Sequence, residues 1–72
     1  MKVKDIIYLE DNEKYNLISS VIYQGRKYFL AAGYKNENDI DMKKLVVLEL
    51  VSDMEVKIVT DDKILMILTP LF

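Results

Sequence analysis

A chain of 72 residues without Cys or His forms one small domain, and neither a disulfide nor an ordinary zinc site can stabilise it. Its net charge of −2 argues against indiscriminate nucleic-acid binding, and its content of 51% hydrophobic and 31% charged residues excludes a disordered segment. Self-association is the remaining route to extra stability. We therefore expect a single domain, residues 1–72, that forms a dimer or tetramer.

We expect no signal peptide at the first residues, because Met1 to Asp5 lead directly into a short alternating run without an apolar h-region. No apolar stretch reaches the length of about eighteen residues that a membrane helix needs. We therefore expect a cytoplasmic protein that does not contact a membrane.

The first half of the chain predicts three strands, over residues 3–9, 14–23 and 27–34. The two-residue connection Gln24-Gly25 is a tight hairpin signal, since Gly25 is free to adopt a positive φ, and it predicts antiparallel pairing of the second and third strands. In the second strand four apolar residues share one parity, which predicts one buried face: Tyr15, Leu17, Val21 and Tyr23.

Residues 35–43 are rich in Asn, Asp and Glu, which predicts the longest loop of the chain. Residues 45–51 are apolar except for Glu49, a pattern typical of a strand covered on both faces or placed at a subunit contact. A tight turn at Ser52-Asp53 then leads to a half-buried fifth strand ending at Ile58.

Thr60-Asp61-Asp62 provides oxygen atoms that can cap a helix start, so we expect a short C-terminal helix. Pro70 lacks the N–H needed to continue a helix, and regular structure should end near Leu68 or Thr69, with the last residues turning away. The predicted class is α+β: an antiparallel meander of four or five strands followed by one short helix.

The helix is apolar around most of its circumference, because Leu65 and Met66 extend the apolar positions beyond one face. One sheet face cannot cover such a helix, so we predict that it buries its apolar side chains between subunits. The predicted oligomer interface consists of Ile64, Ile67, Leu68, Leu71 and Phe72.

A nucleic-acid surface is the alternative binding site. Residues 1–35 carry six basic and four acidic side chains, whereas residues 36–72 carry four basic and eight acidic ones. Basic residues also alternate with aromatic residues on the second and third strands, a combination that single-stranded nucleic acid binding uses, although the same tyrosines suit ordinary cross-strand packing. The candidate residues are Lys14, Arg26, Lys27, Tyr28 and Lys35.

Enzyme chemistry has little support in the sequence. Without His or Cys there is no base for the common nucleophile arrangements, and we expect neither a cofactor nor a metal site. The acidic pairs Glu10-Asp11 and Asp61-Asp62 could in principle bind Mg²⁺, but turns and helix starts favour Asp for local reasons. The alternating oxygen side chains of residues 36–41 lack the Gly and the distant Glu of a calcium loop.

The hairpin Tyr23-Gln24-Gly25-Arg26-Lys27-Tyr28 and the spacing of the apolar strands 5–11 and 45–50 resemble a known family. It comprises short acidic single-domain proteins of Gram-positive bacteria, catalogued as a domain of unknown function. These motifs belong to the fold, and the resemblance brings no catalytic residue with it. This chain is less acidic than that family and ends in the apolar residues 64–72 instead of an acidic helix.

The order of strands followed by one helix is also similar to the fold of the positive transcriptional coactivator. That resemblance implies pairing through helices and binding of single-stranded DNA across the sheets.

These observations lead to three functional hypotheses. The first is a non-enzymatic, homo-oligomeric binding or regulatory module, with an unidentified protein as a further partner. The second is a nucleic-acid-binding protein of a phage or mobile element that counters host defence, as anti-CRISPR proteins do. The third is a metal-dependent nuclease that uses Asp11 and Asp61.

Overall fold

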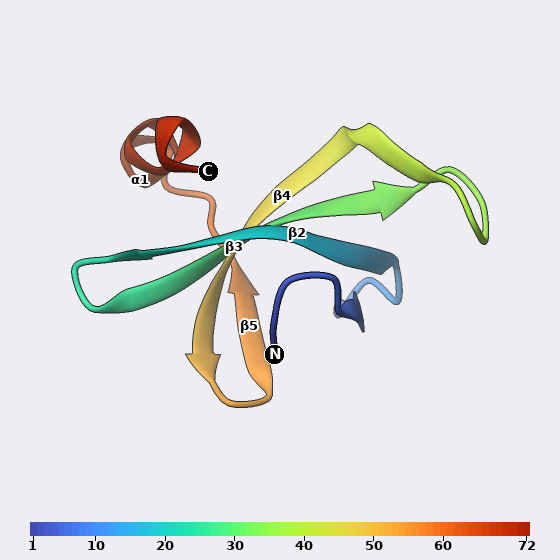
Figure 1. Ribbon diagram of the computed structural model, residues 1–72, viewed down its shortest axis with the longest axis horizontal. Helices are drawn as coiled ribbons and strands as arrows, with labels where there is room; N and C mark the ends of the chain where they lie inside the picture. The colour runs from blue at the N-terminus through green and yellow to red at the C-terminus, as the bar shows by residue number, and fades with distance from the viewer.

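The computed structural model describes residues 1–72 and confirms the α+β class, with one five-stranded sheet followed by a C-terminal helical segment (Figure 1). Every strand pairs antiparallel with the next in chain order, so the sheet is a meander that curls into a half-barrel. No helix is long and apolar enough to span a membrane. The elements are β1 (Ile6–Tyr8), β2 (Lys14–Tyr23), β3 (Arg26–Tyr34), β4 (Ile40–Ser52), β5 (Glu55–Ile58), α1 (Asp62–Leu68) and the 3₁₀ turn η1 (Thr69–Leu71).

The predicted hairpin between β2 and β3 is confirmed. Tyr23 pairs with Arg26, and the two residues between them, Gln24 and Gly25, have φ angles of 51° and 77°. Two successive positive φ values give a turn whose twist matches that of the flanking strands. Only Gly adopts this conformation without a steric cost, so Gly25 defines the hairpin.

The prediction of a single buried face on β2 is wrong, because a β-bulge at Ile18 interrupts the strand. Leu17 pairs with Ala31, but Ser19 already pairs with Leu30, so Ile18 is an extra residue. An extra residue reverses the alternation of side chains beyond it. Residues 15 and 17 therefore point to one face of the sheet, and residues 21 and 23 to the other.

Two separate clusters of buried side chains lie on the opposite faces of the sheet. We call them the half-barrel core, formed by Tyr15, Leu17, Phe29, Ala31 and Leu48, and the helix-side core, formed by Tyr28, Val47 and Leu68. Neighbouring residues of β3 and β4 serve different cores because successive strand side chains alternate between faces. Val47 and Leu48 are both buried, so the centre of this strand is covered on both faces as predicted, whereas the ends of the predicted range, Leu45 and Val51, are exposed.

The first strand is shorter than predicted and begins at Ile6 rather than Val3. Lys4 has a φ of 80°, and Asp5 Oδ2 accepts a hydrogen bond of 3.0 Å from the backbone N–H of Lys2. The chain therefore makes a turn before β1, and Val3 lies within that turn.

The polar loop is also shorter than predicted, since β4 begins at Ile40. Asn36 Oδ1 accepts hydrogen bonds of 3.1 Å from the backbone N–H groups of Asn38 and Asp39. This side-chain cap closes the turn early. Beyond it Gly33 pairs with Asp41 and Ala32 with Leu45, so residues 42–44 form a bulge within β4.

The helix start is confirmed. Asp61 is the N-cap residue, and its Oδ1 accepts a hydrogen bond of 2.9 Å from the backbone N–H of Lys63. The predicted end near Leu68 is confirmed as well, but the last residues do not turn away. Pro70 is the second residue of the 3₁₀ turn η1, and Phe72 packs back against the helix-side core. The turn before β5 is shifted by one residue, to Asp53 and Met54.

Candidate binding surface

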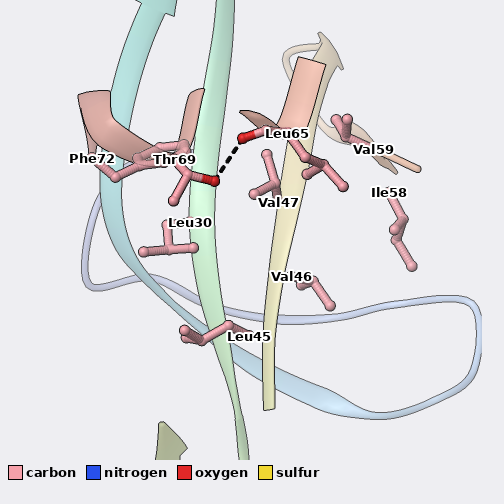
Figure 2. A pocket seen from close by; sticks show the side chains of 9 residues that line it. All are labelled: Leu30, Leu45, Val46, Val47, Ile58, Val59, Leu65, Thr69 and Phe72. Carbon is pink, nitrogen blue, oxygen red and sulfur yellow. Dashed lines mark hydrogen bonds between the residues drawn. The ribbon is translucent and has the colours of Figure 1, made fainter. Parts of the chain in front are cut away.

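An apolar groove of about 330 Å³ lies between the C-terminal helical segment and the sheet (Figure 2). Strand β5 pairs with β4 only as far as Leu48, because the chain leaves the sheet after Ile58 to form α1. The part of β4 around Leu45 therefore has no neighbour on that side, and the groove opens there. Its lining residues are Leu30, Leu45, Val46, Val47, Ile58, Val59, Leu65, Thr69 and Phe72.

The groove offers no free polar side chain to a ligand. Thr69 is its only polar lining residue, and the Thr69 hydroxyl donates a hydrogen bond of 2.6 Å to the carbonyl oxygen of Leu65 (Figure 2). A groove whose lining side chains offer no free donor or acceptor favours apolar side chains as occupants.

The outward side of the helix continues this apolar character. Met66 is 76% exposed, Ile67 41% and Leu71 49%, and residues 64–72 contain no charged side chain. We define the C-terminal apolar surface as the groove together with these three residues. Contiguous exposed apolar area of this kind marks interaction sites in soluble proteins.

The structure divides the predicted interface residues into two groups. Ile67 and Leu71 are exposed, as an interface requires, whereas Leu68 is fully buried in the helix-side core. Ile64 and Phe72 are half-buried against the same core. Leu68 therefore attaches the helix to its own sheet and is not available at the surface.

Sequence reasoning missed the sheet residues of this surface. Leu45 and Ile58 line the groove and are each 45% exposed, although their apolar neighbours suggested buried strands. Their exposure depends on the path by which the chain leaves the sheet after Ile58, and no local sequence signal gives that path. Met66 was recognised as apolar but was not assigned to the interface.

The predicted nucleic-acid residues do not form one surface. Lys14 and Lys35 lie at one end of the β2–β3 hairpin, and Arg26 and Lys27 lie at the other. The nine residues of β3 span roughly 26 Å at about 3.3 Å per residue. Arg26 and Lys27 are also neighbours on one strand, so their side chains leave opposite faces of the sheet.

Several of these side chains are already engaged within the chain. Lys14 Nζ donates a hydrogen bond of 2.6 Å to the carbonyl oxygen of Glu37 and lies 4.2 Å from the centre of the Tyr34 ring. Arg26 forms an ion pair of 3.6 Å with Glu49. Tyr28 is only 4% exposed and therefore offers no surface on which a base could stack.

The acidic pairs have local structural roles. Asp61 caps α1, and Asp11 Oδ1 accepts a hydrogen bond of 2.9 Å from the backbone N–H of Glu13. No group of three or more acidic side chains is close enough to hold a metal ion.

The pKa of Lys44 is raised above its ordinary value. Its Nζ lies 3.1 Å from Glu13 Oε2, and this hydrogen bond raises the pKa of Lys44 because it stabilises the ammonium form. The same Nζ lies 5.6 Å from the centre of the Tyr15 ring. These contacts hold the bulged part of β4 against β2.

Comparison with models of known protein families, with curated proteins and with solved structures finds no match. The family resemblance drawn from the hairpin and the strand spacing therefore stays a hypothesis. A function for this chain has to be argued from its own surfaces.

Proposed function

We propose that this protein is a non-enzymatic binding module that works as a homo-oligomer, most simply a dimer formed through the C-terminal apolar surface. The observation that supports the proposal is the imbalance between buried and exposed apolar residues. Ten of the 72 residues are buried, whereas thirteen large hydrophobic side chains are exposed. Three of those thirteen lie on the last turns of the chain, where no charged side chain accompanies them.

The energetics of association favour this surface over the other exposed apolar residues. Burial contributes about 25 cal/mol per Å², so a few hundred Å² give several kcal/mol before the cost of association. Two copies that meet through the same patch bring no like charges together, because residues 64–72 are uncharged. The groove of each copy can receive exposed side chains from the helix of the other.

Light scattering coupled to size exclusion tests the proposal directly. We expect a mass of twice 8.4 kDa at micromolar concentrations and dissociation on dilution. In Met66→Glu and Ile67→Glu, association would place an unpaired carboxylate in an apolar contact, which costs several kcal/mol. Each substitution should therefore weaken the dimer at least tenfold.

Ile22→Glu is the matched control. Ile22 is 71% exposed, and its neighbours Val21 and Tyr23 point to the helix side of the sheet, so Ile22 lies on the opposite face. This variant should associate as the wild type does. A stable monomer across the micromolar range, or equal weakening in all three variants, would remove the C-terminal apolar surface as the interface.

A further inference from the structure

The half-barrel has two open edges that cannot pair with each other in the manner of the rest of the sheet. All four pairings are antiparallel and follow chain order, so β1 and β5 run in the same direction. An antiparallel meander closes on itself only with an even number of strands. One additional strand, running opposite to both β1 and β5, would complete the alternation.

The backbone of β5 has free hydrogen-bonding groups along this opening. The backbone N–H of Val59 donates to the carbonyl oxygen of Val47 at 2.8 Å, and Leu48 pairs with Ile58. In an antiparallel ladder every second residue bonds to the partner strand, so Lys57 bonds towards β4 as Val59 does. The N–H and C=O groups of Val56 and Ile58 therefore face the open edge.

The same reasoning applies to β1. The N–H of Leu17 donates to the carbonyl oxygen of Asp5 at 2.9 Å. The N–H of Leu9 donates to the carbonyl oxygen of Glu13 at 3.1 Å. These two bonds define the residues that face β2. The backbone groups of Ile6 and Tyr8 consequently face the open edge, and both side chains are exposed.

Tyr8 of β1 and all four residues of β5 line a single cavity of about 780 Å³, which we call the seam. Its inner wall is formed by three residues that contact the half-barrel core: Met1, Leu9 and Val56. The charged side chains that line it are three acidic ones and one basic one: Glu10, Asp11, Glu55 and Lys57. The seam therefore combines an apolar floor, two rows of unpaired backbone groups and a mainly acidic rim.

We propose that the seam binds an extended segment of a partner protein, in which apolar and basic residues alternate, as a sixth strand between β1 and β5. The apolar side chains of the segment lie against Leu9 and Val56, because alternate side chains of a strand point to one face. The basic side chains point outward to Glu10 and Glu55. Backbone hydrogen bonds to both edges hold the segment, as in other cases of strand addition. This site shares only Ile58 with the lining of the C-terminal apolar surface and does not depend on dimer formation.

A seven-residue peptide of alternating lysine and valine is a suitable probe, followed by amide NMR of the full chain. Binding should shift the amide signals of Ile6, Tyr8, Val56 and Ile58 and slow their hydrogen exchange. Affinity should fall as salt rises, because the charged contacts lie at an exposed rim. A peptide with glutamate in place of lysine should bind at least tenfold more weakly.

Two further comparisons separate strand addition from unspecific adhesion. A peptide N-methylated at alternate residues keeps its donors to one edge and loses those to the other, so each of the two possible methylation patterns should weaken binding. In the protein, Tyr8→Pro removes one edge donor, whereas Tyr8→Ala keeps it. Tyr8 belongs to neither core, and its N–H makes no ladder bond, so both variants should fold. Tyr8→Pro should bind the lysine–valine peptide about threefold to tenfold more weakly than Tyr8→Ala, the effect of losing one hydrogen bond.

The proposal is overturned if millimolar peptide leaves the four edge amides unchanged, or if either methylated peptide binds as the parent does. Equal affinity of the two Tyr8 variants would also contradict it. If the edge amides become protected with rising protein concentration and without peptide, a second copy fills the seam, and the partner segment proposed here is wrong.

Discussion

At the scale of single residues, Gly33 is required because Lys44 lies across it. A Cβ atom at position 33 would stand 2.8 Å from Cγ of Lys44 and 3.0 Å from its Cε, closer than packed carbon atoms approach. Gly33 has no positive φ, so its role is to leave space and not to allow a special backbone conformation. The Lys44 chain can then extend to Glu13, the partner that raises its pKa.

Gly33→Ala tests this account. The added methyl group should displace Lys44 and break its contact with Glu13, at a cost of about 1–2 kcal/mol in the free energy of unfolding. Urea denaturation measures that cost, and NMR titration should show the Lys44 pKa returning to its ordinary value. In a Lys44→Ala background the obstructing carbons are gone, and the same substitution should have almost no effect. If Gly33→Ala lowers the free energy of unfolding equally in both backgrounds, then the backbone at position 33, and not the Lys44 side chain, opposes the added methyl group.

The binding residues predicted from the sequence show why side-chain type is a weak guide to exposure. Tyr28 suggested a stacking platform, but the helix covers it, since it faces the same side of the sheet as Leu68. Arg26 and Lys27 suggested one basic patch, yet neighbouring strand residues always point to opposite faces. Exposure at these positions depends on the location of the helix, which residues 14–35 do not encode.

At the scale of elements, strand positions were predictable and strand faces were not. The bounds of β2 agree with the prediction, and those of β3 differ by one residue, because turn residues and apolar alternation define them locally. The bulge in β2 escaped prediction because Ile18 is apolar, so it interrupts no visible pattern. The start of β4 escaped it because a side-chain cap at Asn36 shortens the loop.

The bulge makes a specific prediction about deletions. If Ile18 is an insertion, removing it leaves Leu17 opposite Ala31 and Ser19 opposite Leu30, and every other side chain keeps its face. The deletion variant should therefore unfold cooperatively, within about 2 kcal/mol of the wild type, as surface-strand changes usually do.

Deletion of Ala31 is the comparison for this experiment. Ala31 lies opposite Leu17 on one side and Val46 on the other, in pairs without an extra residue on β3. Its removal reverses the faces of the rest of β3 and should prevent folding. Circular dichroism during thermal denaturation distinguishes the two variants. Loss of folding in the Ile18 deletion would show that the bulge itself is needed.

At the scale of the whole molecule, the fold class and half of the binding surface could be predicted. A terminal helix that is apolar around most of its circumference follows from residues 60–72 alone. The sheet half of the groove and the seam could not be predicted, because both depend on where edge strands end in space. Those positions result from the curl of the sheet and from the pairing of strands distant in the sequence.

The two cores should also differ in the rate at which they open. Leu68 is the one fully buried side chain of α1, whereas the half-barrel core is built from five buried residues on three strands. Local opening needs less free energy where fewer apolar side chains are buried. Native-state hydrogen exchange should show the amides of residues 65–68 exchanging faster than those of residues 28–31, which need global unfolding. Similar rates in both segments would mean that the two cores open together.

Because Leu68 is the only fully buried side chain of α1, the attachment of this helix affects how long the chain survives among proteases. Each detachment of the helix uncovers Tyr28 and Val47 for its brief duration, and a protease can cleave the released residues 59–72 in that interval. The lifetime of the intact chain among proteases is then governed by the most weakly held segment, even when the sheet remains folded. A partner that covers the C-terminal apolar surface would lengthen that lifetime without changing a single contact in the half-barrel.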